Sequence, residues 1–453
     1  MTRRMHRREF LGNTLLAGAG LSVAGRSAAL GAPAETKKPA LKRRGSPNEK
    51  LNIAIIGAGH RGNANTNGVK SENIVALCDV NSVLMGRAAK RFPKAKTYKD
   101  WRKCLEQKDI DAVVCTTTDH THAFIAVGAM ELGMHVYCEK PLAHSVYEAR
   151  RVRDTYIKHK DKVATQQGTQ IHATENYRRV VELVQGGALG KVTEAHAWCN
   201  RVGPGGDWPT KTGDLVPDYL DWDLWCGPAP KRPFSAKILP PDHKHNCLKW
   251  NLYWDYGQGT MGDMGSHLMD LPFWALDLDS PTTVETKADP WPAHPVTCSK
   301  WLIATYQHPA KGNRGPVKLV WYDATKRPKS PPGIDLSKWG IGVMFVGDKG
   351  KLVADYGKHY LLPRRDYRDF EPPTMKIPSS LGHYREWIRA CKTGAPTLCN
   401  FDYAGKLIEN NLLANVAYRA GKKLTWDAKN LKAVGCSQAD QFIRREYRKG
   451  WTI

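Results

Sequence analysis

A glycine-rich turn directly after an apolar run is the feature that most restricts the fold of this 453-residue chain. The run, residues 51–56, reads as a buried strand, and Gly57, Gly59 and Gly62 follow it in the spacing G-x-G-x-x-G. At such a turn the first glycine permits a tight bend, the second lets the backbone approach a pyrophosphate, and the third lets a helix pack on the strand. Amide groups at the start of that helix would meet the phosphates. The stretch therefore predicts a dinucleotide-binding turn.

The sequence after this turn alternates between apolar runs and amphipathic stretches. Continuous apolar strands joined by helices are typical of a parallel sheet covered on both faces, which is the doubly wound Rossmann arrangement. We therefore expect an α/β fold for this part of the chain. The predicted strands lie in residues 51–59, 73–80, 111–118 and 135–141, and the helices in residues 83–92 and 122–133.

A carboxylate at the end of the second predicted strand indicates which dinucleotide the turn would hold. Asp79 lies 22 residues after Gly57. At about this distance an acidic side chain bonds the ribose hydroxyls of NAD and repels the 2′-phosphate of NADP. Arg61, and Asn81 near Asp79, leave some room for NADP, which is the less favoured cofactor. The prediction is NAD, and a glycine turn that binds another ligand is the alternative.

The first 34 residues have the pattern of an export signal. Arg7 and Arg8 precede a short, moderately apolar stretch, as in twin-arginine signals, which direct proteins that are already folded. Small residues near position 34 offer a cleavage site, and residues 35–50 read as a charged linker. We expect the twin-arginine machinery to export the protein to the periplasm, and a disordered basic tail is the alternative.

Composition excludes several other classes of protein. The net charge is +24, of which residues 1–50 carry +8, and the remainder is spread without a basic run or a groove-reading motif. We therefore expect no nucleic-acid partner. No apolar run reaches the roughly 18 residues that a membrane span requires. The eleven cysteines form no C-x-x-C pair, and no ligand spacing predicts a metal site.

The stretch GTMGDMGSHLMDLPFW, residues 259–274, places Asp263 and His267 four positions apart. On a helix this spacing puts both side chains on one face. A carboxylate beside an imidazole can accept the ring proton, fix the tautomer and raise the basicity of the ring. The pair suits a general base, but it would equally satisfy a half-buried histidine, so the pattern alone leaves both interpretations open.

Glu139-Lys140-Pro141 follows the last predicted strand of the parallel sheet and resembles the signature of the Gfo/Idh/MocA oxidoreductases. This family is named for glucose-fructose oxidoreductase and inositol dehydrogenase. The similarity covers nearly everything after residue 50, in the expected order. Thr118 departs from the pattern, because many relatives carry proline there. The other similar stretches are residues 117–133, 165–192, 221–230, 401–427 and 447–451.

The resemblance implies a chain of two domains. Residues 51–172 would form the NAD(P)-binding Rossmann domain, and residues 173–453 a C-terminal α/β domain with a predominantly antiparallel open sheet. This second domain would flank the cofactor cleft and join subunits into a dimer or tetramer. The pattern of residues agrees: strands are predicted in residues 283–289, 300–307, 317–323, 342–348 and 350–356, and helices in residues 174–185, 383–392 and 404–421.

The resemblance also assigns a catalytic set, Lys140, Asp263 and His267, at the substrate carbon that would face the nicotinamide. Removing a hydride from a carbinol requires that the hydroxyl proton leaves too. His267 could accept this proton, Asp263 could orient the imidazole, and Lys140 could stabilise negative charge on oxygen. The residues expected to bind the cofactor are Gly57, Gly59, His60, Arg61, Gly62, Asp79, Thr117, His120, His122, Glu139, Lys140 and Gln167.

The substrate is expected to be a carbohydrate or a cyclic polyol. Six of the fifteen tryptophans lie in residues 198–254, and aromatic faces beside polar groups suit a sugar ring, although such residues also fill cores. The leading expectation is an exported NAD-dependent oxidoreductase that acts on a CHOH group. The alternatives are an NAD-dependent, redox-neutral glycoside hydrolase and a non-catalytic NAD-binding protein. Gln170 and His172 are expected to line the cleft, and Asp270 to serve in packing or capping.

Overall fold

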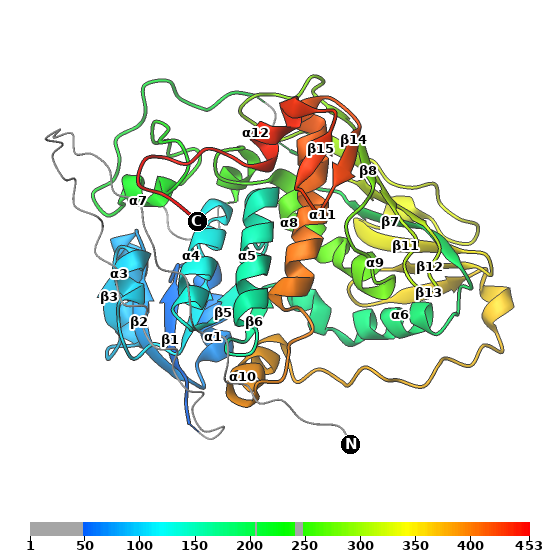
Figure 1. Ribbon diagram of the computed structural model, residues 1–453, viewed down its shortest axis with the longest axis horizontal. Coiled ribbons are helices and arrows are strands. Elements are labelled where there is room, and N and C mark those ends of the chain that lie inside the picture. Colours follow the sequence, from blue (N-terminus) through cyan, green and yellow to red (C-terminus); the bar gives the residue numbers. More distant parts are fainter. Residues whose placement is uncertain (1–48, 204–205, 241–247) are drawn as a thin grey trace, which may run out of the picture. The chain divides into compact units, whose positions relative to one another are not determined.

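The computed structural model describes residues 49–203, 206–240 and 248–453 (Figure 1). The predicted signal, residues 1–34, and nearly all of the predicted linker, residues 35–50, lie outside these described residues. Within the described residues the chain forms two β-sheets. No helix in this part of the chain combines the length and the apolar character needed to cross a bilayer.

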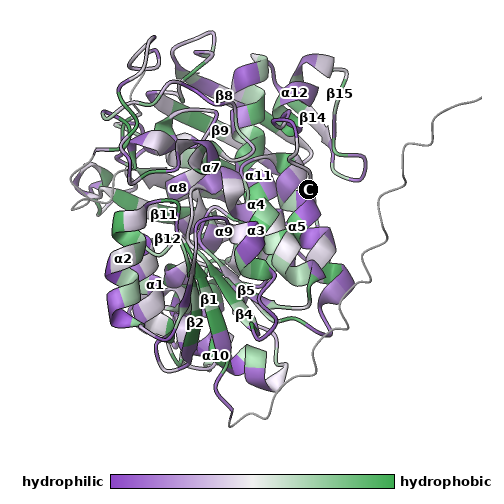
Figure 2. Ribbon diagram, turned by 90° about the vertical axis from the view of Figure 1, so that its left-hand side faces the viewer, coloured by the Kyte–Doolittle hydropathy of each residue, from purple (hydrophilic) through white to green (hydrophobic). Residues whose placement is uncertain are grey.

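The first sheet has six strands, all parallel, in the order β3-β2-β1-β4-β5-β6. The strand order reverses beside β1, as in the doubly wound Rossmann fold. Its strands are apolar because both faces are covered, and Figure 2 shows β1, β2 and β4 as a hydrophobic band. Its elements are β1 (Asn52–Ile56), α1 (Arg61–Val69), β2 (Asn73–Cys78), α2 (Ser82–Arg91), β3 (Lys96–Tyr98), α3 (Trp101–Leu105), β4 (Ala112–Cys115), α4 (Asp119–Glu131), β5 (His135–Cys138), α5 (Val146–His159) and β6 (Thr165–Gln167).

The second sheet has nine strands in the order β13-β12-β11-β7-β10-β9-β8-β14-β15. Only the β7–β10 pair among them is parallel, so the predicted combination of a parallel Rossmann sheet with a predominantly antiparallel one is confirmed. Its strands are β7 (Val192–Cys199), β8 (Thr283–Asp289), β9 (Trp301–His308), β10 (Val317–Tyr322), β11 (Ile341–Gly347), β12 (Lys351–Ala354), β13 (His359–Leu362), β14 (Leu424–Asp427) and β15 (Lys432–Val434).

The helices of the second part of the chain gather on one face of this sheet. β7, β8 and β11 contact α8, α9 and α11, and Val284, Tyr306 and Leu319 are fully buried there. Side chains that point to the other face, such as Ile303 and Thr305, remain partly exposed. The helices are α6 (Glu175–Gln185), α7 (Trp222–Cys226), α8 (Gly259–Leu268), α9 (Asp270–Ala275), α10 (His383–Thr393), α11 (Phe401–Ala420) and α12 (Asp440–Ile443).

Local sequence determines where several helices begin and end. Asn81 accepts hydrogen bonds from two amide groups at the start of α2, and Ser145 accepts one at the start of α5. Side-chain oxygens at these positions satisfy amides that have no partner within the helix. α11 ends at Gly421, which has a φ of +66°, a left-handed conformation that favours glycine.

One helix from late in the chain covers the first sheet. α10 contacts α1 and β6, and its Trp387 is fully buried in the same cluster as Ile53 and Val114 (Figure 1). Close approach is possible because Gly68 has no side chain: a Cβ there would lie 2.4 Å from the ring of Tyr384. Packing between segments that are distant in sequence therefore joins the two halves of the chain.

Candidate active site

A cavity of about 410 Å³ extends from the glycine turn to α8. Its lining comes from the carboxyl ends of strands in the first sheet, from α8, and from residues within 219–240 and 248–251. Ligands of doubly wound sheets bind at this edge, and sites for small molecules and cofactors usually have volumes of about 300–1,000 Å³. We call the part lined by Gly57, Gly59 and Asp79 the turn end, and the part lined by Lys140, Arg201, Asp263 and His267 the α8 end.

The glycine turn has the close contacts that its sequence predicts. Gly57 has a φ of +87°, and a Cβ there would lie 2.6 Å from the carbonyl oxygen of Thr116. A Cβ at Gly62 would lie 1.9 Å from the carbonyl oxygen of Gly57, so the helix could not pack so closely with any other residue. Gly57 and Gly59 line the cavity. The backbone at the start of α1 is thus open to a pyrophosphate, so the turn fits a dinucleotide.

Asp79 lines the turn end and holds the glycine turn in place. Its Oδ2 accepts hydrogen bonds from the amides of Ala58, at 2.9 Å, and Gly59, at 3.1 Å. Its Oδ1 accepts one from the amide of Asn81 at 2.9 Å. Burial raises the pKa of this carboxyl above its ordinary value, although the amide hydrogen bonds oppose the shift. The carboxylate therefore faces the position where the ribose of a dinucleotide would lie.

Glu139 anchors the segment that carries Lys140. Its Oε1 accepts hydrogen bonds from Arg61 at 2.8 Å, from Asn65 at 3.0 Å and from Gln170 at 3.0 Å. Gly168 leaves the room that this requires, because a Cβ there would lie 2.7 Å from the carboxyl carbon of Glu139. The position of Lys140, which follows directly, is therefore set by several neighbouring elements.

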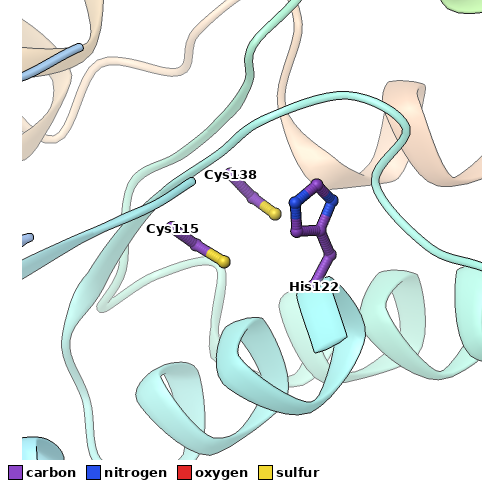
Figure 3. Close-up of side chains that lie close together, drawn as sticks. All are labelled: Cys115, His122 and Cys138. Atoms are coloured by element: carbon purple, nitrogen blue, oxygen red, sulfur yellow. The ribbon is translucent and has the colours of Figure 1, made fainter. Parts of the chain in front are cut away.

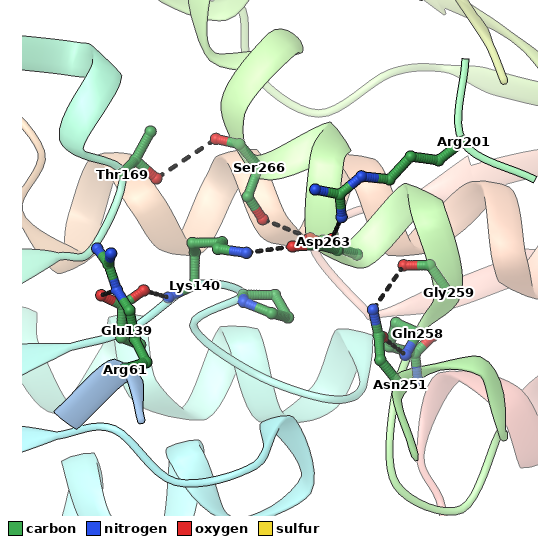
Figure 4. Close-up of polar contacts among 12 residues, drawn as sticks. Arg61, Glu139, Lys140, Thr169, Arg201, Asn251, Gln258, Gly259, Asp263 and Ser266 are labelled. Atoms are coloured by element: carbon green, nitrogen blue, oxygen red, sulfur yellow. Dashed lines mark hydrogen bonds and ion pairs between the residues drawn. The ribbon is translucent and has the colours of Figure 1, made fainter. Parts of the chain in front are cut away.

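Two cations share one buried carboxylate at the α8 end (Figure 4). The Nζ of Lys140 donates to Oδ1 of Asp263, and the Nη1 of Arg201 donates to Oδ2. The Asp263 side chain is 7% exposed, whereas that of Arg201 is 50% exposed. Burial opposes ionisation of Asp263, but the charges of Lys140 and Arg201 outweigh it and keep the pKa of the carboxyl below its ordinary value.

Contacts of α8 explain how this helix comes near to Lys140. A Cβ at Gly262 would clash with Cβ of Gln258, at 2.5 Å, and would only touch Cγ of Pro141, at 3.7 Å, so glycine is needed here for the start of α8 while the helix lies beside the Glu139-Lys140-Pro141 segment. The Oγ1 of Thr169 donates to the carbonyl of Ser266 at 3.3 Å, which joins α8 to the chain after β6 (Figure 4). These contacts bring Asp263 to the side chain of Lys140.

The predicted hydrogen bond between Asp263 and His267 is absent, which corrects the expectation that Asp263 orients the imidazole. Both carboxylate oxygens are occupied by cations, which attract a carboxylate more strongly than a neutral ring does, and Nδ1 of His267 is buried without a partner. Both residues nevertheless line the cavity. Burial and the charge of Lys140 lower the pKa of His267 to about 3, so the ring is neutral near neutral pH.

Asp119 and Arg201 line the α8 end, and neither was singled out from the sequence. Asp119 is the first residue of α4, and its Oδ2 is buried without a hydrogen-bond partner. Burial raises its pKa to about 7, although His122 and Lys140 oppose the shift. Arg201 lies in the loop after β7. No local motif marks it, because its partner Asp263 lies 62 residues away.

Most of the predicted cofactor contacts line the cavity, but three do not. The nine that do are Gly57, Gly59, His60, Arg61, Asp79, Thr117, His122, Glu139 and Lys140. Gly62 lies behind the turn. The imidazole of His120 lies 2.9 Å from the carbonyl oxygen of Trp225, and Gln167 is fully buried and donates to Thr169.

Two residues near the cleft also serve in packing. His172 was expected to line the cleft together with Gln170, but only Gln170 does so. The Nδ1 of His172 lies 3.0 Å from both carboxylate oxygens of Asp270, and its ring stacks on Trp274. Asp270 is fully buried and also accepts from Tyr403 at 2.7 Å, so it has the structural role that the sequence suggested.

Cys115, His122 and Cys138 come together beneath the cavity (Figure 3). The two cysteines are direct register partners on β4 and β5. Burial would raise the pKa of Cys115, but the neighbouring Cys138 and His122 lower it to about 6. The ring nitrogens of His122 lie 2.7 Å from the carbonyl oxygen of Pro141 and 3.0 Å from that of Thr117. Both ring nitrogens of His122 therefore contact backbone carbonyls of residues that line the cavity.

The six tryptophans of residues 198–254 divide into two groups. Trp225 and Trp250 line the cavity and can contact a ligand. The others pack elsewhere: Trp222 stacks on Trp225 with ring centroids 4.6 Å apart, and Trp254 donates to the carbonyl of His294. Trp198 belongs to β7 and is buried in another cluster, and Trp208 packs on Tyr253. Trp208, Trp222, Trp225 and Trp250 therefore form a small core with one edge at the cavity.

Comparison with known proteins identifies both parts of the chain. Residues 51–167 match the family model described as the NAD-binding Rossmann fold of the Gfo/Idh/MocA oxidoreductases. Residues 205–314 match the model of the C-terminal α/β domain of this oxidoreductase family. The predicted NAD-binding Rossmann fold is thereby confirmed.

Each of the curated relatives matches this chain over only part of its own length. Inositol 2-dehydrogenase of Salmonella typhimurium is 31% identical over 151 residues, which is 32% of this chain and 43% of that protein. Alpha-N-acetylgalactosaminidase of Shewanella oneidensis is 27% identical over 301 residues, which is 54% of this chain and 64% of that protein. The chain thus spans less than two thirds of the length of these curated relatives.

The solved structures agree on the fold. Levoglucosan dehydrogenase in complex with NADH and levoglucosan superposes with a TM-score of 0.56 at 17% identity, over 83% of this chain and 98% of that chain. Likeness at this identity concerns the fold alone. Family models match both halves of the sequence, and the expected pair of sheets is present. The chain therefore belongs to the Gfo/Idh/MocA family of oxidoreductases.

Proposed function

We propose that the protein is an NAD-dependent oxidoreductase that oxidises a CHOH group of a sugar, a sugar derivative or a cyclic polyol. The observation that carries the proposal is a single cavity that joins the dinucleotide-binding turn end to the lysine, aspartate and histidine of the α8 end. Relatives named inositol 2-dehydrogenase and levoglucosan dehydrogenase support a substrate of this class. The protein would bind NAD at the turn end and the substrate at the α8 end.

The residues of the α8 end have the properties that this chemistry needs. NAD, when bound, accepts a hydride from the substrate carbon. His267 is neutral near neutral pH because its pKa lies at about 3, and so low a pKa makes it a weak base. It can accept the hydroxyl proton as departure of the hydride makes that proton strongly acidic. Lys140 is held in place by Asp263 and can donate to the substrate oxygen. Asp79 favours NAD over NADP, because its carboxylate would repel a 2′-phosphate.

A second candidate function uses the same site without net redox change. The match to alpha-N-acetylgalactosaminidase, over 301 residues, supports it. In this route a glycoside is oxidised, loses its aglycone by elimination, takes up water and is reduced again. Release of a free sugar from a glycoside without added NAD would identify this route. A non-catalytic NAD-binding role is less well supported, because Lys140, Asp263 and His267 all line the cavity.

The test of the proposed function uses the purified full chain. Mass spectrometry first identifies what co-purifies in the cavity, and NADH formation is then measured with a panel of sugars, cyclic polyols and glycosides. The proposal expects NADH from a sugar or polyol, or free sugar from a glycoside. Tight NAD binding with no turnover on the whole panel would contradict it and favour the non-catalytic role.

We also propose export to the periplasm by the twin-arginine machinery, on the basis of the arginine pair in the amino-terminal 34 residues. Changing Arg7 and Arg8 to lysine keeps the charge but removes the pair that the machinery recognises. The lysine variant should remain in the cytoplasm, as shown by cell fractionation. Normal export of this variant by the twin-arginine machinery would contradict the proposal.

We further propose that the protein forms a homodimer or tetramer through the open face of the second sheet. Ile303 and Thr305 on β9 and Tyr322 on β10 are partly exposed on the face opposite α8 and α11. Residues 334–339 cover part of this face, but the half-buried side chains on β9 stay partly exposed there and favour association with another subunit. Ile303→Glu should lower the mass measured by light scattering to that of a monomer, and an unchanged mass would contradict this interface.

A further inference from the structure

The guanidinium of Arg201 is a charged group of the cavity that proton transfer does not require. It lies at the α8 end, in the loop that follows β7. Its Nη1 donates to Oδ2 of Asp263. The carboxylate is buried, at 7% exposure, but the arginine side chain is 50% exposed. Arg201 therefore contacts the catalytic carboxylate on one side and presents its other side to the open part of the cavity.

The donors of Arg201 are only partly used. A guanidinium has five N–H groups in a planar fork. Among the described residues, only Nη1 of Arg201 has a hydrogen-bond partner, and Nε and Nη2 have none. A planar fork of this kind matches a carboxylate through two parallel hydrogen bonds. The cavity thus offers an unused site for a planar anion beside the position proposed for the reacting carbon.

The charge balance at the α8 end also favours an anion. Lys140 and Arg201 are both paired with the one carboxylate of Asp263. The other carboxyl at this end, Asp119, faces His122 and Lys140, and no hydrogen bond joins it to Arg201. Because burial raises the pKa of Asp119 to about 7, its protonated form leaves two cations on one carboxylate. In that form the α8 end has an excess of positive charge, which attracts an anionic ligand into a partly closed cavity.

A second arginine shows what a purely structural pair looks like in the same part of the chain. Arg232 donates through Nε to Asp255, is 30% exposed and lies over the ring of Trp208. Its charged group contacts both a carboxylate and an aromatic ring, and it is not part of the cavity lining. Arg201 differs because both it and its carboxylate partner line the cavity, and its remaining donors have no hydrogen-bond partner among the described residues.

We propose that Arg201 is a specificity-determining residue that binds a carboxylate of the substrate, which would therefore be a sugar acid such as a uronic acid. The inference rests on the proposed function. The two cations bind the two oxygens of one carboxylate, so Arg201 lies only a short distance from Lys140. The substrate carboxylate is accordingly placed within a few bonds of the carbon whose hydroxyl contacts Lys140. A sugar phosphate shares the negative charge but lacks the planar match to the fork.

The test compares matched pairs of acidic and neutral sugars on NAD-loaded protein. The pairs are D-glucuronate with D-glucose and D-galacturonate with D-galactose, and D-glucose 6-phosphate supplies the phosphate. Binding is measured by calorimetry and kcat/KM by NADH formation. The wild type should favour each acid over its neutral partner by about 10- to 100-fold, as expected for a charge-assisted pair of hydrogen bonds. Arg201→Gln should remove this preference, and Arg201→Lys should retain part of it.

The ratio of acid to neutral sugar separates binding of the carboxylate from any general effect on Asp263, because both sugars meet the same catalytic residues. Arg232→Gln is the matched control and should leave the ratio unchanged. Equal binding of acids and neutral sugars by the wild type, or a preference for the phosphate, would overturn the inference while leaving the proposed function intact. Failure to form NADH with every sugar, alongside Arg201-dependent binding of the acids, would instead contradict the proposed function alone.

Discussion

The two ends of the cavity are built in different ways. At the turn end the ligand would meet backbone from the contiguous residues 57–62, held by the carboxylate of Asp79. At the α8 end the lining consists of side chains from separate segments, and Asp263 holds Lys140 and Arg201 by charge. Binding of the cofactor therefore depends on the shape of one local turn, whereas the proposed chemistry depends on long-range packing. The two properties should respond to different substitutions.

The largest effect is expected from Lys140→Ala and His267→Ala. Each should lower turnover by about 10²–10⁴-fold, the usual contribution of a positioned acid or base. NAD affinity should change little, because both residues lie at the α8 end. Turnover and calorimetric NAD binding are measured on the same preparations, together with the melting temperature. Folded His267→Ala protein with normal turnover would remove this residue from the mechanism.

Asp263→Asn should cost less activity than loss of Lys140, because the amide keeps the shape of the side chain but no longer holds two cations. A loss of about 10- to 100-fold is expected. The structure pairs Asp263 with Lys140 and not with His267. In double-mutant cycles Asp263→Asn should therefore be strongly non-additive with Lys140→Ala and closer to additive with His267→Ala. The reverse pattern would restore the orienting role that the sequence suggested.

Asp79→Ser tests the turn end. Loss of the carboxylate should shift the preference from NAD towards NADP by roughly tenfold or more, because the repulsion of the 2′-phosphate disappears. The residues of the α8 end are unchanged, so turnover with saturating NAD should remain close to that of the wild type. Dissociation constants for both cofactors provide the measurement. A wild type that already prefers NADP would contradict the assignment of Asp79 to the ribose.

His308→Gln is a control substitution that lies outside both ends of the cavity. His308 on β9 is buried, and burial together with the charge of Arg314 lowers its pKa to about 4 from the ordinary 6.5. As the pH falls, this histidine is protonated in the unfolded chain before it is protonated in the folded protein. Its contribution to the free energy of unfolding is therefore fully present above the ordinary pKa and decreases as the pH falls towards the pKa of the folded protein. The loss is on the order of 3 kcal/mol.

In the His308→Gln variant this part of the acid sensitivity should disappear. Urea unfolding at several pH values between about pH 7 and pH 4 compares the two proteins. The variant should lose less stability than the wild type over this interval, whereas NAD binding and turnover should stay the same at neutral pH. Parallel stability curves for the two proteins would show that His308 does not titrate as its burial suggests.

The elements that the sequence predicted are those with a strong local pattern. The parallel strands carry continuous apolar runs, and β8 and β9 lie where alternation placed them. β7 was not predicted, although it is central in the second sheet, because residues 195–199 are buried on both faces and show no alternation. β13, β14 and β15, of three or four residues each, were not predicted either.

At the candidate site, too, the sequence predicted only the features that lie close together along the chain. The glycine turn and Asp79 are recognisable because they are close in sequence, and Lys140 is recognisable from the Glu-Lys-Pro motif. The four-residue spacing of Asp263 and His267 correctly placed both on one side of α8, where they line the cavity. It did not predict their partners, because Lys140 and Arg201 reach Asp263 from segments 123 and 62 residues away.

The central claim is that hydride passes from a substrate carbon at the α8 end to a nicotinamide bound from the turn end. The most direct measurement is a single turnover of NAD-loaded protein with a perdeuterated sugar acid or its neutral counterpart, quenched in base and read by mass spectrometry of the cofactor. The wild type should yield reduced nicotinamide that carries one deuterium, and Lys140→Ala, with equal bound NAD, should yield almost none. Conversion of the sugar with no deuterium in the nicotinamide would contradict the account.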